Sequence, residues 1–289
     1  MRHLSDIELH YNLFSGLVPL EWYGMSGLFR LNVGGNLLSG TISTEICNLT
    51  NLRNLFVMEN MFTGTIPGQV GKLTRLGKCC LSVKIWRLFC FWIKIFLTVR
   101  ALLLCPAFTR WSRNLLSGNI PTELANLQGL QELWLHGNLL TGPIPTEMGL
   151  MRFLRDLRLH FNFLIGPINE EIYNMRSLTR LDVYDCELSG TISPRIFELR
   201  SLRDFRVRNN KMTGAIPVQM SLNTNLERVW LHGNQFAGTL PLAICDLVSQ
   251  AFLRDLVADC GPSEGGGPPL LECVCCTACC NATNVCTSQ

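Results

Sequence analysis

The feature that most constrains this chain is a repeat of 24 residues. The stretch LHGNLLTGPIP at 135–145 returns as LHGNQFAGTLP at 231–241, four repeat lengths later. A leucine opens each of nine such units. These leucines are Leu4, Leu28, Leu52, Leu76, Leu130, Leu154, Leu178, Leu202 and Leu226. A period of this length predicts small structural units that stack, because no single unit can bury its own apolar face.

Each unit follows the pattern L-x-x-L-x-L-x-x-N-x-L-x-G-x-I-P. The L-x-L part alternates with a period of two, so its apolar side chains face one side of a short strand. The Asn recurs where the chain must turn inward, and its amide can bond the backbone of adjacent turns. The Gly permits a tight bend, and Pro suits an extended segment that has no donor to lose. Cys186 stands at one Asn position and is predicted to be a buried ladder residue.

This pattern resembles the plant-type leucine-rich repeat of receptor-like kinase and receptor-like protein ectodomains. The resemblance covers about residues 4–252 apart from one interruption. It implies a leucine-rich repeat solenoid of the α/β class, a right-handed superhelix with a parallel β-sheet on its concave face. Short 3-10 or loop segments are expected on the convex face. Because the chain has no kinase signature, the resemblance carries over only the ectodomain.

One unit is interrupted. Leu76 and Leu130 lie 54 residues apart where 24 are expected, and we place the off-pattern insertion near 78–107. Its segment 85–105, IWRLFCFWIKIFLTVRALLLC, is the most apolar stretch of the chain. Lys94 and Arg100 disfavour a membrane span, which would also place half a solenoid on each side of a bilayer. The favoured interpretation is a translated intron, since the codons of Gly77-Lys78-Cys79 can contain a splice donor. A genuine loop insertion and a membrane segment are the alternatives.

The two ends of the chain differ. Only three residues precede the first repeat, so we expect the carboxyl-terminal part of a longer protein, with any signal peptide in the missing portion. Residues 253–289 are predicted to form a cysteine-rich cap, similar to the endings of some secreted algal repeat proteins. A zinc site at Cys276-x-x-Cys279 is the less favoured alternative to disulfides. Eight cysteines are candidates for disulfides, in 105 possible connectivities: Cys245, Cys260, Cys273, Cys275, Cys276, Cys279, Cys280 and Cys286.

The composition and short motifs limit where the protein is located and which functions it can have. Dense cysteines and the Asn-x-Thr sequons at Asn48 and Asn281 indicate an extracellular or cell-surface glycoprotein, with a membrane or cytoplasmic location as the alternative. The net charge of +3 is too small to indicate a nucleic-acid partner. We find no phosphate-binding loop or catalytic motif, and therefore expect no enzyme activity, cofactor or metal.

The candidate ligand site lies on the concave face of units five to nine. Residues between the leucines of each strand point outward there and form two columns rich in Trp, Tyr, Arg and His. The candidates are Trp134, His136, Arg158, His160, Tyr184, Arg206, Arg208, Trp230 and His232. Protonation of the histidines below about pH 6.5 is expected to strengthen binding of an acidic partner. The alternatives are that the columns simply pack on each other, or that His136 and His160 hold a metal.

The sequence thus predicts a recognition module for a peptide, glycan or protein, as a fragment of a larger secreted or receptor-like protein. The alternative is a structural or adhesive wall protein without a specific soluble ligand. Membrane contact is expected only if 85–105 is a genuine span.

Overall fold

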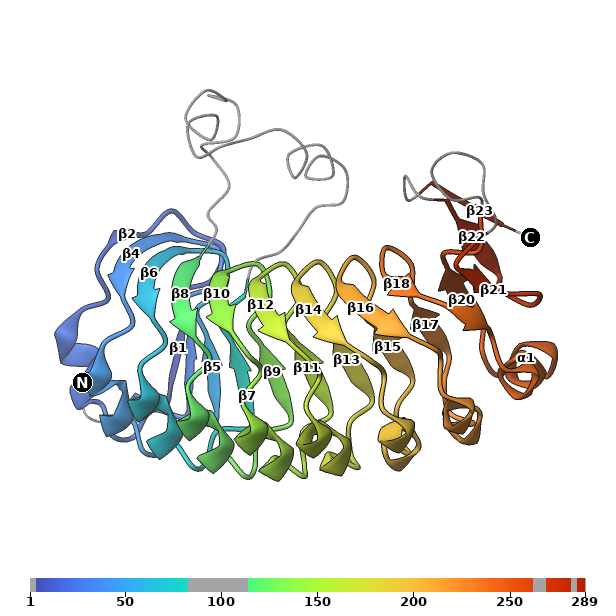
Figure 1. The fold of residues 1–289 in the computed structure, drawn as a ribbon. Helices are drawn as coiled ribbons and strands as arrows, with labels where there is room; N and C mark the ends of the chain where they lie inside the picture. Colours follow the sequence, from blue (N-terminus) through green and yellow to red (C-terminus); the bar gives the residue numbers. More distant parts are fainter. Residues whose placement is uncertain (1–3, 83–113, 262–268, 282–284, 289) are drawn as a thin grey trace, which may run out of the picture.

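The computed structural model describes residues 4–82, 114–261, 269–281 and 285–288, which form a curved solenoid of stacked coils (Figure 1). A typical coil contributes one strand to an inner sheet, one strand to a second sheet and one 3-10 helix between them. The predicted leucine-rich repeat solenoid is therefore confirmed.

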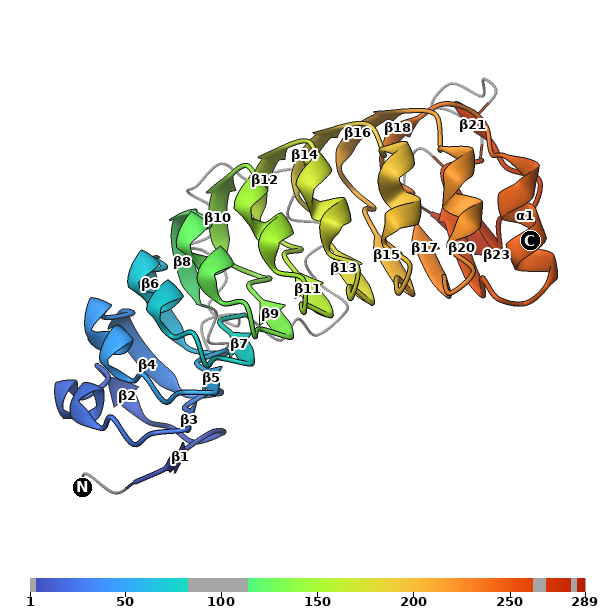
Figure 2. The same cartoon turned by 90° about the horizontal axis from the view of Figure 1, so that it is seen from below.

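The inner sheet has 12 strands and lines the inner side of the arc (Figure 2). Its strands are parallel except for the last pair. In spatial order they are β1 (Asp6–Glu8), β3 (Arg30–Asn32), β5 (Asn54–Phe56), β7 (Lys78–Cys80), β9 (Glu132–Trp134), β11 (Asp156–Arg158), β13 (Arg180–Asp182), β15 (Asp204–Arg206), β17 (Arg228–Trp230), β20 (Asp255–Ala258), β22 (Ala278–Cys280) and β23 (Cys286–Ser288).

A second parallel sheet, which the sequence pattern did not predict, follows the outer edge of the arc (Figure 2). The L-x-G part of each unit forms it. Its strands are β2 (Ser15–Gly16), β4 (Leu37–Thr41), β6 (Met61–Thr65), β8 (Leu115–Asn119), β10 (Leu139–Gly142), β12 (Phe163–Gly166), β14 (Glu187–Gly190), β16 (Lys211–Gly214) and β18 (Gln235–Phe236). The short strands β19 (Gly238–Thr239) and β21 (Leu271–Glu272) pair beside it. Gly64 shows why glycine recurs here: its φ is 75°, and an added Cβ would lie 2.9 Å from Cγ2 of Thr41.

The remaining side of each coil is a 3-10 helix. Ser43, Asn169 and Ser193 cap three of these helices with side-chain oxygens that accept a backbone N–H. The helices are η1 (Leu20–Gly24), η2 (Thr44–Asn48), η3 (Gly68–Lys72), η6 (Thr122–Asn126), η7 (Thr146–Leu150), η8 (Glu170–Asn174), η9 (Pro194–Glu198) and η10 (Val218–Leu222). In the last coil the α-helix α1 (Leu242–Ser249) takes this place.

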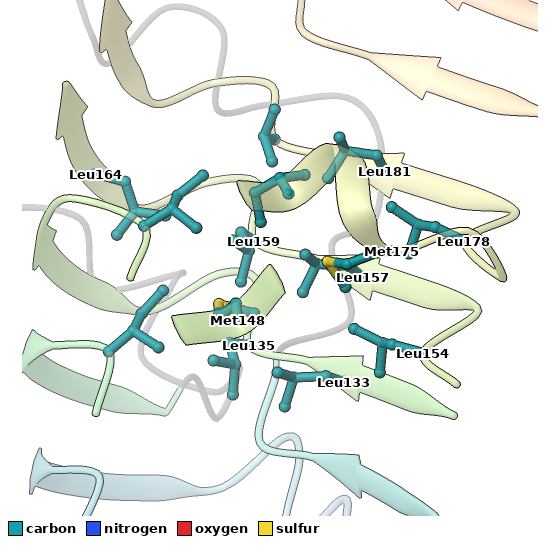
Figure 3. Close-up of a cluster of buried hydrophobic side chains, with 14 of the residues drawn as sticks. Leu133, Leu135, Met148, Leu154, Leu157, Leu159, Leu164, Met175, Leu178 and Leu181 are labelled. Carbon is teal, nitrogen blue, oxygen red and sulfur yellow. The ribbon is translucent and has the colours of Figure 1, made fainter. Parts of the chain in front are cut away.

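One continuous core runs between the two sheets and the helices. The repeat leucines, such as Leu133, Leu154 and Leu157, are fully buried and share one cluster with Met148 and Met175 (Figure 3). The asparagine ladder closes the turn after each inner strand. Asn138, for example, donates to the carbonyl oxygens of Leu81 and Leu135 at 3.1 and 3.0 Å and accepts from the Leu116 N–H at 3.2 Å.

Most other units repeat this arrangement. Cys186, at an Asn position, is buried with its Sγ 3.6 Å from the carbonyl oxygen of Leu159.

The interrupted unit corrects the predicted start of the insertion. The range near 78–107 included Lys78–Cys80, but these residues form β7, which pairs with β5 and β9. Cys79 fills the position of a core leucine and is fully buried. After Ser82, the chain is next described at Asn114, whose Nδ2 donates to the Leu81 carbonyl at 3.1 Å. Both ends of the interruption therefore lie in one turn.

Segment 85–105 and its candidate membrane span lie outside the described residues. Within the described ranges, no helix combines the length and apolarity that crossing a membrane requires.

We expect a chain that lacks residues 84–113 to fold. The deletion joins Val83 to Asn114 and restores the 24-residue spacing, while β7 and the Asn114 hydrogen bonds stay in place. Closing a loop of this length costs about 3 kcal/mol of chain entropy, so the variant should melt at the same temperature as the full chain or above it. Circular dichroism melts of both proteins check this. Aggregation or a much lower melting temperature would show that the segment supports the fold.

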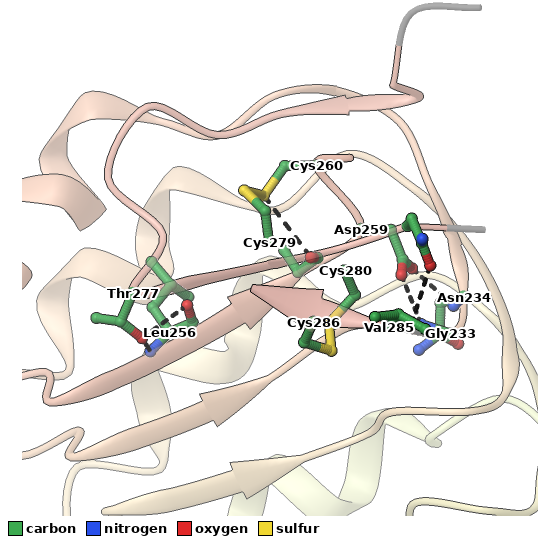
Figure 4. Close-up of a disulfide and its surroundings, with 12 residues drawn as sticks. Gly233, Asn234, Leu256, Asp259, Cys260, Thr277, Cys279, Cys280, Val285 and Cys286 are labelled. Carbon is green, nitrogen blue, oxygen red and sulfur yellow. Dashed lines mark hydrogen bonds between the residues drawn. A yellow bond between two sulfur atoms is a disulfide. The ribbon is translucent and has the colours of Figure 1, made fainter. Parts of the chain in front are cut away.

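Four disulfides tie the last coil together, and Figure 4 shows those of Cys260 with Cys279 and of Cys280 with Cys286. They join Cys245 to Cys275, Cys260 to Cys279, Cys273 to Cys276, and Cys280 to Cys286. All eight candidate cysteines are thus paired, and both members of the Cys276-x-x-Cys279 zinc alternative are used in disulfides. Helix α1 carries Cys245 and covers the end of the core with its buried Ile244 and Leu247.

Candidate functional site

Four of the nine candidate side chains lie at the ends of neighbouring inner strands and the other five lie two residues beyond these ends, and we call the nine the inner patch. The strand register places Trp134 beside Arg158, Arg158 beside Asp182, and Asp182 beside Arg206, which is followed by Trp230. Adjacent strands of a sheet lie about 4.8 Å apart, so side chains of one column touch. The spacing that the repeat predicted therefore brings these residues together.

The histidine column is a stack of rings. The rings of His136 and His160 lie 4.3 Å apart at 13°, and those of His160 and Tyr184 lie 4.2 Å apart at 13°. Phe161 meets the last two rings edge-on at 5.5 and 5.4 Å. Stacked and edge-on contacts of this kind are favourable and hold the rings in one position.

Guanidinium groups lie over the outer rings of the inner patch. Arg158 lies 4.1 Å from the ring centroid of Trp134, and Arg206 lies 4.4 Å from that of Trp230. Arg208 lies 4.6 Å from the Tyr184 ring. These cation–π contacts attach the charged groups to a flat aromatic base.

A row of alternating charges runs across the inner sheet beside the inner patch. The strand register aligns its members, which we call the charge row: Asp156, Arg180, Asp204, Arg228 and Asp255. The Asp204 carboxylate is almost completely buried and accepts from Nε of Arg180 at 2.9 Å and from Arg228. Burial alone would raise its pKa, but the hydrogen bonds from Arg228 and Arg180 outweigh burial and lower the pKa of Asp204.

Asp182, in the inner patch column, behaves differently. Burial raises its pKa to about 6, although Arg206, Arg180 and Arg158 act in the opposite direction. The contact of Asp182 with Arg206 is 3.5 Å, longer than the hydrogen bonds that Asp204 accepts. The attraction therefore offsets less of the cost of removing the Asp182 carboxylate from water.

The expectation that the histidines gain charge below pH 6.5 is wrong for two of them. Burial and the nearby Arg208 lower the pKa of His232 to about 4. Burial, followed by His136 and three arginines, lowers the pKa of His160 still further. His136, His160 and His232 are each less than a tenth exposed, and the rings of His136 and His160 cover each other. The sequence placed them on the correct face but could not show that their neighbours bury them.

The metal alternative for His136 and His160 finds no support in this geometry, since parallel rings 4.3 Å apart do not aim two lone pairs at one ion. Across the described residues, two groups bring three metal-ligand atoms within 4.8 Å of one another. One is His232 with Cys280 and Cys286, and the other consists of Cys260, Cys273 and Cys276. All of these cysteines are in disulfides.

Several buried polar atoms in and beside the inner patch have no hydrogen-bond partner in the described part of the chain. Such groups usually find partners in solvent or in a ligand. The inner patch therefore offers donors and acceptors as well as ring faces. These atoms are Trp134 Nε1, His160 Nδ1, Asp182 Oδ1, Arg206 Nε, Arg208 Nε, Asn209 Oδ1 and His232 Nδ1.

Sequence reasoning missed four residues of this region. Cys80 lies beside Trp134 and is fully buried, but the interruption hid its unit. Phe161, Asp185 and Asn209 stand at the turn after the strand with φ between 51° and 55°, a conformation that non-glycine residues rarely adopt. Asp185 holds Arg208 at 3.3 Å and accepts from Asn209 at 2.9 Å. Glycine at the equivalent positions 35, 137 and 233 was the available signal that this turn is left-handed.

Comparison with known proteins agrees with the fold. The leucine-rich repeat family model matches residues 129–151 and 225–247. No curated protein matches the sequence. Among solved structures, a TDR receptor superposes with a TM-score of 0.73 and 24% identity, covering 90% of this chain and 39% of the receptor chain.

Two further solved structures are similar. The Arabidopsis receptor kinase HAESA, in complex with the peptide hormone IDA and the co-receptor SERK1, has a TM-score of 0.70 and 28% identity over 83% of this chain and 36% of its own. A plant ice-binding protein has a TM-score of 0.64 and 23% identity, and the match covers 94% of this chain and 76% of that protein's chain. This chain spans about two fifths of the receptor chains. The repeat pattern and these comparisons show that the chain has the leucine-rich repeat fold and is similar to plant leucine-rich repeat ectodomains.

Proposed function

We propose that the chain is a recognition module that binds a peptide or protein ligand on the inner patch. The observation that carries this proposal is the row of rings and guanidinium groups on β9 to β17 and on the turns that follow these strands. Trp, Tyr and Arg are the residues that dominate binding energy at protein interfaces. The HAESA ectodomain, which has a similar fold, was solved with a peptide hormone bound.

The contacts of the inner patch favour binding because they fix it in advance. Trp134 and Trp230 are partly exposed, and each is held by an arginine across its ring. Side chains that are already ordered lose little conformational entropy when a ligand arrives. The buried histidines support the surface from within and are not the primary contacts.

The test replaces both tryptophans by alanine in one protein. Peptides from an extracellular fraction are captured on the immobilised chain, identified by mass spectrometry and synthesised, and their affinity is measured by calorimetry. Truncating one interface anchor costs about 2 kcal/mol or more, so the Trp134→Ala, Trp230→Ala variant, which removes two, should bind roughly 1000-fold more weakly. A thermal melt confirms that the variant is folded.

Phe153→Ala is the matched control. Phe153 is also a large exposed aromatic residue, 64% accessible, but it precedes β11 and lies outside the inner patch. Its replacement should leave the affinity unchanged. Unchanged binding by the tryptophan variant, together with loss of binding in Phe153→Ala, would place the site on another face.

A further inference from the structure

The second sheet has an outward surface without a charged residue over six consecutive strands. Along a strand, alternate residues point to the same side. We call these residues the neutral face, and they are the first, third and fifth residues of segments 13–17, 37–41, 61–65, 115–119, 139–143 and 163–167. Strands β2 to β12 carry them along the outer edge of the arc (Figures 1 and 2).

An exposed apolar row runs along the neutral face. Met61, Leu115, Leu139 and Phe163 are the first residues of their segments and are 40%, 43%, 41% and 48% accessible. A single exposed leucine is ordinary, but a row of apolar side chains over consecutive strands marks an interaction surface.

A row of hydroxyl groups runs between the apolar side chains. The strand register sets Thr63 directly beside Leu115, and Thr141 directly beside Phe163. Ser39 and Thr63 donate their hydroxyl hydrogens to the carbonyl oxygens of the preceding strand, at 3.4 and 3.3 Å. Their oxygens therefore remain as acceptors in fixed positions.

The neutral face ends abruptly at β14. There the first residue of the segment is Glu187, and in β16 it is Lys211, and the two form an ion pair of 2.8 Å. The uncharged surface is thus confined to one part of a sheet that otherwise keeps the same backbone geometry.

We propose that the neutral face binds an uncharged linear polysaccharide. A sugar ring has apolar C–H faces and a rim of hydroxyl groups, and the neutral face supplies apolar side chains and hydroxyls side by side in a line. Acidic polymers and anionic lipids are recognised through Lys and Arg, which the neutral face lacks. A protein partner with an ordinary content of charged residues would have to bury some of them against the neutral face without an opposite charge, which costs free energy. This site lies on a different sheet from the inner patch and does not depend on it.

The experiment sediments the full chain with insoluble cellulose, xylan or β-1,3-glucan, and with cross-linked polygalacturonate as the acidic control. Two variants differ only in position: Thr141→Lys adds a charge in the neutral face, and Thr213→Lys adds it at the equivalent exposed residue of β16. We expect retention on at least one neutral polymer. Thr141→Lys should weaken retention about tenfold, because the ammonium loses water without gaining a partner, and Thr213→Lys should leave it nearly unchanged.

Three results would overturn the proposal. The first is no retention on any neutral polymer, or equal retention on polygalacturonate. The second is an equal effect of Thr141→Lys and Thr213→Lys. The third is a dimer in gel filtration that Thr141→Lys dissociates, which would make a second copy of this chain the occupant. The tryptophan variant of the inner patch should be retained like the unmodified chain, and this separates the site from the proposed ligand site.

Discussion

Replacing Asp204 by Asn is expected to lower the free energy of unfolding by about 3 kcal/mol or more, because it removes the anion of a buried charge cluster. Asp204 accepts from Nε of Arg180 at 2.9 Å and from Arg228, and Arg206 lies 3.7 Å from it. Arg180 and Arg206 retain weaker contacts with Asp156 and Asp182 at 3.6 and 3.5 Å. An amide cannot balance the charges that remain.

Urea unfolding of the two proteins at several pH values measures this effect. The pKa of Asp204 is lowered in the folded state, so its stabilisation is complete above the unfolded value of about 4 and is lost as the pH falls through the folded value. The difference between the proteins should therefore be full at neutral pH and shrink in acid. Glu187→Gln is the control, since its ion pair with Lys211 is exposed and worth less than about 1 kcal/mol. Equal losses of unfolding free energy in Asp204→Asn and Glu187→Gln would show that the Asp204 cluster stabilises the fold no more than an exposed ion pair does.

Removing the disulfide between Cys245 and Cys275 is expected to have an effect of similar size on the end of the solenoid. The two cysteines are 30 residues apart, and chain entropy predicts a loss of about 3 to 4 kcal/mol for a loop of this length. The pair joins α1 to the last coils, so its loss should let β20 to β23 open while the central coils stay folded. Amide hydrogen exchange of a Cys245→Ser, Cys275→Ser protein locates the opened region.

A shorter disulfide provides the matched control. Cys273 and Cys276 are only 3 residues apart, and the same entropy relation predicts roughly half the effect for their replacement by serine. Intact mass with and without reductant, under denaturing conditions, tests whether all four pairs are oxidised, since each pair gains two hydrogens on reduction. Free thiols among these cysteines in the native protein would refute the pairing.

The repeat predicted most of the fold because its pattern follows from local chemistry. The alternation at Leu133 and Leu135 makes a strand whatever lies beyond it, and Asn138 needs backbone partners wherever its turn is buried. The second sheet was missed because L-x-G looks like a bend when one unit is considered alone. Identical extended segments in successive coils pair only after the coils have stacked. β7 was missed because the Asn of its unit, Asn114, follows 30 residues later than the pattern expects.

The sequence could predict where the candidate site lies, but not how deeply its side chains are buried or whether its histidines are charged. The spacing of 24 residues is sufficient to align Trp134 with Arg158, and Arg206 with Trp230. It does not reveal that His160 lies between two other rings or that this burial keeps it uncharged. Accessibility and pKa depend on the side chains of adjacent coils, and these vary independently of the repeat pattern.

The charge row also limits which substitutions this protein can accumulate during evolution. Because Asp204 is shared by Arg180 and Arg228, a single substitution at any of the three removes a charged contact from at least one of the others. Changes along this row are therefore expected to be epistatic, so that one replacement is tolerated only after a compensating one in the next coil. The inner surface would then diversify slowly and in linked steps.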